Sequence, residues 1–143
     1  MTIDAVAAEL EIRNVIAALA QFADTGTVDE YVNLFTDDGV WEMPANPANG
    51  VPASNRTGRA EIAAGVHDRR AAGVQGPGSA TRHVVSTIRV MLRSPDEADA
   101  QVYFQYFADT TTTPRLLSVG HYEDRFHRTP EGWKLARRRI VLG

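Results

Sequence analysis

The sequence predicts a single α+β domain, residues 1–143, in which helices pack on one face of a strongly bent antiparallel sheet. Helical apolar patterns dominate the first half, and four strand patterns follow one another in the second half. No repeat or linker interrupts this order. With 143 residues, 43% of them apolar, the chain can build one core but not two.

The first helix is predicted over residues 3–23, where apolar residues recur at helical spacing. Thr2 or Asp4 can cap its start, and Gly26 is typical of a helix end. Asp24 follows the last turn, where the helix dipole disfavours an anion. Another group is therefore expected to use its carboxylate.

A second, shorter helix begins after Thr27, which forms a capping-box pattern with Glu30. We then expect a turn over residues 36–39 and a short strand over 40–43. Residues 44–58 and 73–80 are predicted as loops rich in glycine, proline and asparagine, on either side of a third helix over 59–72. The charged run over residues 67–70 of that helix indicates a solvated face. Two long loops around one helix suit the rim of a pocket.

The stretch from 82 to 92 predicts a long strand with a histidine near its start. Alternation places His83, Val85, Thr87 and Arg89 on one face, while the other face is apolar apart from a serine. If the first face lines a cavity, His83 is the best general-base candidate in the chain.

Three more strands are predicted over 98–109, 116–128 and 133–142. Phe104 and Tyr106 share a face with Val102, which suits a pocket wall. Arg138 points to the opposite face from its two arginine neighbours, so the triple arginine is not one basic patch.

Composition excludes several classes of function. A net charge of −3 and a pI near 5.8 argue against nucleic acid or an anionic membrane surface as partner. There is no cysteine, no apolar run long enough to span a bilayer and no basic leader at the N-terminus, so we expect a cytoplasmic protein. His121 and His127 would lie about 20 Å apart on one strand, and no phosphate-binding glycine motif is present, so neither a metal nor a cofactor is expected.

Several short motifs in a fixed order carry a resemblance to a known family. They are residues 23–31, residues 34–41, the pair Arg82-His83, residues 120–126, and residues 132–135 with Arg138. Together they resemble the SnoaL-like proteins of the NTF2-like superfamily over nearly the whole chain. The resemblance implies a cone of three helices closing a curved sheet around a deep, mostly apolar pocket, and a homodimer formed through the sheet.

The resemblance also implies an Asp–His dyad, as in scytalone dehydratase and lindane dehydrochlorinase. Asp24 and His83 occupy the two positions here. A carboxylate on one ring nitrogen fixes the tautomer and makes the other nitrogen more basic, so that it can remove a proton from carbon.

The chain departs from that pattern at two places. Some of these enzymes carry a tyrosine or lysine where this chain has Leu19, and Phe22 offers no hydroxyl. Relatives often carry an asparagine where this chain has Thr87. Four side chains are candidates for the missing electrophile: Tyr106, which ranks ahead of Tyr103, and Tyr122 and Arg138.

Arg138 has three interpretations: it could stabilise an enolate, bind a carboxylate, or form a structural salt bridge with Asp124 or Glu42. Four residues are predicted to bind substrate: Trp41, Thr87, Phe104 and Tyr122. The aromatic side chains of Trp41 and Phe104 are also suited to a purely structural core.

Three functions fit these features. The first is a cofactor-free, dehydratase-like lyase or isomerase that acts on a small apolar cyclic, polyketide-like or steroid-like molecule, with His83 as base and Asp24 as its orienter. The second is a polyketide cyclase or hydrolase that uses other pocket residues. The third is a non-catalytic ligand-binding or dimerisation module, because a fold does not fix a function.

Overall fold

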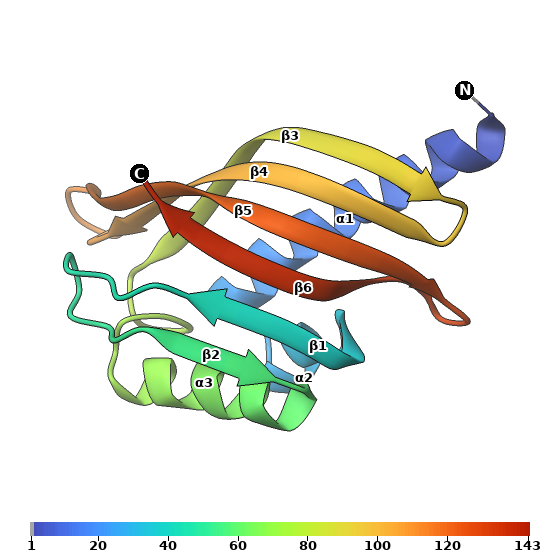
Figure 1. Cartoon of the computed structure of the whole chain (residues 1–143). Helices are drawn as coiled ribbons and strands as arrows, with labels where there is room; N and C mark the ends of the chain where they lie inside the picture. The colour runs from blue at the N-terminus through green and yellow to red at the C-terminus, as the bar shows by residue number, and fades with distance from the viewer. Residues whose placement is uncertain (1) are drawn as a thin grey trace.

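A computed structural model of the chain describes residues 2–143 (Figure 1). The predicted α+β architecture is confirmed: over these residues, three helices pack against one curved, open, six-stranded sheet. The helices are α1 (Ile3–Thr25), α2 (Val28–Val32) and α3 (Arg59–Ala71). The strands are β1 (Phe35–Met43), β2 (Ser54–Thr57), β3 (Arg82–Ser94), β4 (Glu97–Ala108), β5 (Arg115–Thr129) and β6 (Gly132–Leu142).

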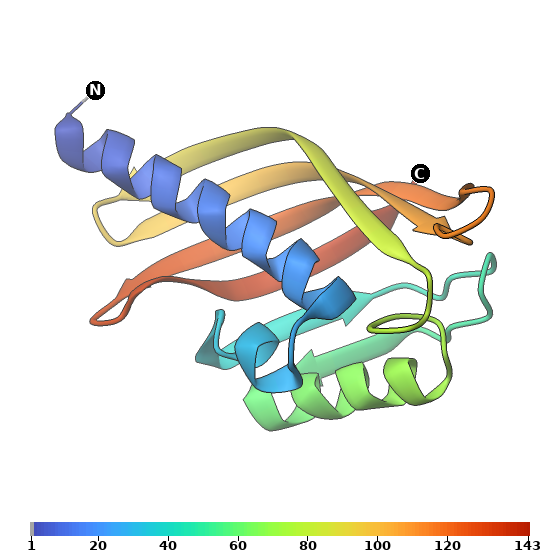
Figure 2. The ribbon, with the colours of Figure 1, turned by 180° about the vertical axis from the view of Figure 1, so that it is seen from behind.

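The strands lie in the order β2-β1-β6-β5-β4-β3, so β2 and β3 form the two edges. Four strands form the predicted antiparallel meander, and β1 joins it in parallel beside β6. Figure 2 shows α1 crossing one face of the sheet, and its contacts are mainly with β3 and β6. The helix α3 lies along β1 and β2.

The N-terminal caps form as predicted. The Thr2 hydroxyl accepts a hydrogen bond from the Ala5 amide at 3.0 Å, and Gly26 ends α1 with its amide bonded to the Phe22 carbonyl. Thr27 and Glu30 form the complete capping box of α2. None of the helices described for residues 2–143 is long and apolar enough to cross a membrane.

The stretch after α2 differs from the prediction. Residues 36–39, expected as a turn, are part of β1, which already begins at the fully buried Phe35. The register against β6 shifts between Phe35 and Val40, so the polar turn-like residues occupy an irregular stretch of the strand rather than ending it. The loop expected over 44–58 also contains the short strand β2, whose polar residues pair with β1 at the sheet edge.

The face assignment along β3 is correct only for its first half. Thr87 has a φ of 52°, and the pairing with β4 shifts between Ser86 and Arg89. This bulge reverses the alternation. His83 and Val85 face inward as predicted, but Ile88 and Val90 replace Thr87 and Arg89 on the inner face.

Candidate active site

Asp24 and His83 come together where the last turn of α1 meets the start of β3. His83 Nδ1 lies 2.7 Å from Asp24 Oδ1, and the backbone amide of His83 donates to both carboxylate oxygens at 3.2 and 3.1 Å. The two side chains are only 7% and 17% exposed. With the carboxylate accepting from Nδ1, that nitrogen carries the proton, and the lone pair of Nε2 is left for another partner.

An arginine from another helix offsets the unfavourable position of the Asp24 anion at the C-terminal end of α1. No basic residue occupies the last turn of α1. Instead, the Arg70 guanidinium of α3 donates to the carbonyls of Phe22 and Ala23 at 3.1 and 3.4 Å. A positive charge at the carbonyl end of the helix offsets the dipole that disfavours Asp24 there.

The imidazole of His83 is also held by packing. The centre of its ring lies 4.5 Å from the centre of the Tyr106 ring, with an angle of 45° between the planes. The Tyr106 hydroxyl donates to the Val74 carbonyl, so it joins β4 to the loop after α3. Burial raises the pKa of Tyr106, which keeps the hydroxyl protonated and able to donate.

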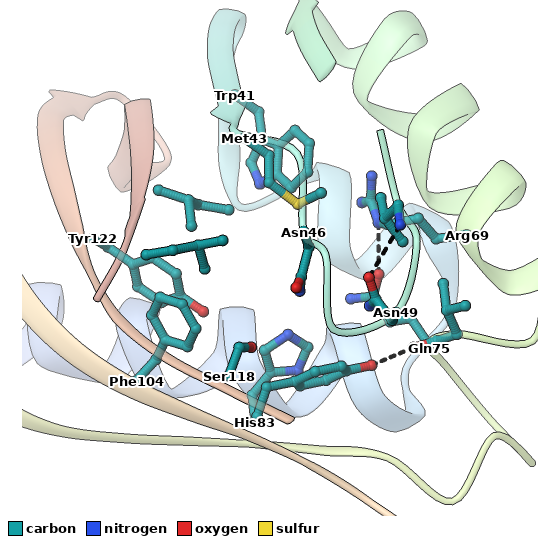
Figure 3. Close-up of a pocket in the computed structure, with 15 residues that line it drawn as sticks. Trp41, Met43, Asn46, Asn49, Arg69, Gln75, His83, Phe104, Ser118 and Tyr122 are labelled. Carbon is teal, nitrogen blue, oxygen red and sulfur yellow. Dashed lines mark hydrogen bonds between the residues drawn. The ribbon is translucent and has the colours of Figure 1, made fainter. Parts of the chain in front are cut away.

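His83 opens onto a largely apolar pocket (Figure 3). The pocket contains about 550 Å³ of empty space, including its open mouth. Its walls come from all parts of the chain: Trp41, Met43, Asn46, Asn49, Val51, Arg69, Val74, Gln75, His83, Phe104, Tyr106, Ser118, Tyr122, Ile140 and Leu142. Both loops predicted at the rim contribute, through Asn46, Asn49 and Val51 from one and Val74 and Gln75 from the other.

A smaller, more polar recess continues from this pocket toward α1 and α2. His83, Arg69 and Tyr122 line both spaces, and Tyr31 and Arg138 line the recess alone. Burial raises the pKa values of the Tyr31 and Tyr122 hydroxyls. Among the residues that the structure describes, neither hydroxyl has a hydrogen-bonding partner, and Figure 3 shows that of Tyr122 directed into the pocket.

Arg138 forms a buried, bidentate ion pair with Asp124. Its Nε and Nη2 donate to the two carboxylate oxygens at 2.9 and 2.8 Å. Burial alone would lower the pKa of Arg138, but the adjacent carboxylate raises it above its ordinary value. Of the three interpretations of Arg138, the structure shows the salt bridge with Asp124, while the guanidinium face lies 3.8 Å from the centre of the Tyr122 ring.

The other predicted site residues fall into two groups. Trp41, Phe104, Tyr106 and Tyr122 line the pocket, and the rings of Phe104 and Tyr122 are stacked with their centres 4.7 Å apart. Thr87 does not line the pocket: it is exposed because the bulge in β3 turns it outward. Tyr103 is 55% exposed on the outer face of the sheet, in keeping with its lower rank.

Arg69 is the main pocket residue that sequence reasoning missed. It was expected on a solvated helix face, but its guanidinium lies 4.3 Å from the centre of the Trp41 ring and its Nε donates to Gln75 Oε1 at 2.6 Å. Burial lowers its pKa. The sequence carried no signal for this, because only the packing of α3 beside β1 turns Arg69 toward the pocket.

The distribution of metal-binding side chains gives no cluster of three or more among residues 2–143. His121 and Glu123 form a pair, with Nε2 and Oε2 3.1 Å apart, on partly exposed side chains away from the pocket. The site combines the Asp24–His83 dyad, aromatic rings, the hydroxyls of Tyr31 and Tyr122, and the guanidinium of Arg69.

Comparison with known domain families identifies the family of this chain. The SnoaL-like domain profile matches residues 4–139. The chain belongs to the SnoaL-like family. A comparison with functionally curated proteins found no match.

Several solved structures of other proteins share the fold of this SnoaL-like chain. An NTF2-like protein with a cystatin-like fold from Novosphingobium aromaticivorans is 27% identical, with a TM-score of 0.79 over 96% of this chain and 82% of that one. A variant of Rv3472, a protein of unknown function from Mycobacterium tuberculosis, is 21% identical, with a TM-score of 0.77 over 94% and 75%. A candidate scytalone dehydratase from Novosphingobium aromaticivorans is 19% identical, with a TM-score of 0.77 over 100% and 89%.

Proposed function

We propose that this SnoaL-like protein is a cofactor-independent lyase or isomerase of the dehydratase kind, which removes a proton from carbon in a small, largely apolar ring compound. The observation that carries this is the 2.7 Å contact between Asp24 and Nδ1 of His83, with the other side of the imidazole facing an apolar pocket. The fold shared with a candidate scytalone dehydratase is in keeping with it.

The dyad supplies the base. His83 Nε2 takes the proton from a carbon beside a carbonyl group, and the Asp24 carboxylate stabilises the imidazolium that forms. In a dehydration, the electrons of the C–H bond form the new double bond and the C–O bond of the leaving hydroxyl breaks. The proton on His83 then passes to the departing oxygen and completes a water molecule.

Tyr122 and Tyr31 fill the place of the electrophile that the chain lacks near Leu19. Their hydroxyls stay protonated because burial raises their pKa values, and no described protein group engages them. Donors that are fixed in a poorly solvated recess stabilise negative charge on a substrate oxygen better than water does. Tyr106 orients the His83 ring rather than donating to substrate, since its hydroxyl is bonded to Val74.

The test is proton exchange, which needs no complete turnover. The protein is incubated in D₂O with 1-tetralone and cyclohexanone, and loss of the α-proton signal is followed by NMR. We expect wild-type protein to accelerate exchange by about 10²-fold or more over the variant His83→Gln. The exposed His67 provides the matched control, so His67→Gln should exchange as fast as wild type.

Equal exchange rates in wild type and His83→Gln, with both still binding the ketones, would overturn the catalytic assignment. They would favour a second candidate, a non-catalytic ligand-binding or assembly module. Two observations support that alternative: Leu19 offers no hydroxyl, and the fold is shared with the β subunit of a candidate aromatic-ring-hydroxylating dioxygenase, 21% identical with a TM-score of 0.74.

We further propose that the protein forms a homodimer through the outer face of its sheet. That face carries Tyr103 and Val119, which are 55% and 46% exposed. Light scattering after size exclusion should give a dimer for wild type and a monomer for Tyr103→Glu. A monomer for both would contradict this.

A further inference from the structure

Arg69 is a cation in the pocket wall with no anionic partner in the part of the chain that the structure describes. Its only described hydrogen bond runs from Nε to the neutral amide oxygen of Gln75, and its flat face rests on Trp41. No carboxylate in residues 2–143 forms an ion pair with it. Neither terminal nitrogen has a hydrogen-bonding partner among the described residues, and Arg69 lines the pocket (Figure 3).

The other charges around the pocket are already matched. Arg138 is neutralised by the bidentate Asp124, and the Asp24 carboxylate is engaged by the ring and the amide of His83. Arg70 does not line the pocket; it donates to neutral carbonyls at the end of α1, and its Nε has no partner among the described residues. Among the described residues that line the pocket, Arg69 is thus the charge without a counterion.

Holding such a charge in a partly desolvated wall costs free energy. The cost is visible as a lowered pKa, caused by burial and, among nearby charges, by Arg56. An anionic ligand group removes that cost, because a guanidinium binds a carboxylate through two parallel, charge-assisted hydrogen bonds. The stacking on Trp41 and the bond to Gln75 hold the plane of the guanidinium in advance, so little side-chain entropy is lost on binding.

We propose that the physiological ligand is a ring compound that carries a carboxylate, with the carboxylate on the terminal nitrogens of Arg69 and the ring against the apolar wall formed by Trp41, Phe104 and Ile140. The aromatic lining of the pocket, Trp41, Phe104 and Tyr122, suits a ring that packs against it. The position of the ring next to His83 rests on the proposed function, whereas the role of Arg69 in binding does not.

The test compares acids with amides of the same shape. Isothermal titration measures the binding of benzoate and 1-naphthoate, and of benzamide and 1-naphthamide, to wild type, Arg69→Gln, Arg69→Lys and Arg128→Gln. Arg128 is a half-exposed arginine in the β5–β6 hairpin, away from the pocket, so its variant makes the same change in net charge. Circular dichroism checks that each variant is folded.

We expect at least one acid to bind wild type about tenfold or more tightly than its amide. Arg69→Gln should abolish that preference, Arg69→Lys should keep part of it, and Arg128→Gln should keep all of it. Equal binding of acids and amides by wild type, or an equal loss in Arg69→Gln and Arg128→Gln, would overturn the assignment.

The two proposals fail separately. If His83→Gln exchanges protons as fast as wild type but the acid preference of Arg69 holds, the pocket binds carboxylates without catalysis. If the exchange depends on His83 but acids and amides bind equally, the enzyme acts on neutral compounds.

Discussion

The carboxylate of Asp24 binds His83 at two places, the ring nitrogen Nδ1 and the backbone amide, although the two residues are 59 positions apart. The amide contact fixes the start of β3 against the end of α1, and the ring contact fixes the tautomer. One buried carboxylate therefore contributes both to the fold and to the proposed chemistry.

Replacing Asp24 by asparagine tests both contributions. The amide oxygen of asparagine can still accept one hydrogen bond, but it cannot stabilise an imidazolium. We expect proton exchange to fall by about 10²–10⁴-fold and the free energy of unfolding to fall by roughly 1.5–3 kcal/mol. Urea denaturation measures the second effect. Asp68→Asn removes a mostly exposed carboxylate in a surface ion pair, so it should change the exchange rate and the free energy of unfolding only slightly.

Removing one partner of the Arg138–Asp124 pair is expected to lower the free energy of unfolding strongly, whereas replacing both partners by apolar residues is expected to lower it little. Arg138→Met leaves a buried carboxylate without its partner, and we expect a loss of about 3–5 kcal/mol in the free energy of unfolding. The double variant Arg138→Met with Asp124→Leu removes both charges and should recover most of that loss. A double variant as unstable as the single one would show that the pair stabilises the fold directly. Denaturation in urea separates the two outcomes.

The buried tyrosines predict instability at high pH. Burial raises the pKa values of Tyr31, Tyr106 and Tyr122 in the folded state, so the unfolded chain loses these protons first. The stabilisation from these raised pKa values is fully present below about pH 10, near the pKa of tyrosine in the unfolded chain. It is lost as the pH rises above this value, at up to about 1.4 kcal/mol per pH unit for each proton. Unfolding free energies at pH 8 and pH 11 should differ less in Tyr122→Phe than in wild type. An unchanged difference would contradict the role of Tyr122.

Thr87 holds a left-handed backbone conformation with a φ of 52°, which is strained for a β-branched residue. Thr87→Gly relieves this strain, and we expect the free energy of unfolding to rise by about 1 kcal/mol. Ligand binding should stay unchanged, since Thr87 is exposed and outside the pocket. Thr87→Val keeps the branching and should give no gain in thermal denaturation. A weaker ligand affinity in Thr87→Gly would support the original prediction that Thr87 binds substrate.

The sequence by itself determined the parts that depend on local spacing. The caps at Thr2 and Thr27 follow from side chains that accept from amides three residues away. The inward face of β4, with Tyr106, follows from simple alternation along a strand. In β6 alternation separates Arg138 from its two arginine neighbours, but the register shift after Leu135 decides that Arg138 is the one that points inward. Asp24 and His83 could be paired only through the family resemblance, since nothing local connects them.

The tertiary structure decided what depends on non-local pairing. The bulge at Thr87 and the parallel pairing of β1 with β6 arise from register between strands, which no local pattern encodes. Asp124 was one of two partners open to Arg138, and only the alignment of β5 with β6 selects it. Arg69 looks like a solvated helix residue until α3 packs beside β1 and turns its charge into the pocket, because burial is a property of the assembled elements and not of the helix that carries the residue.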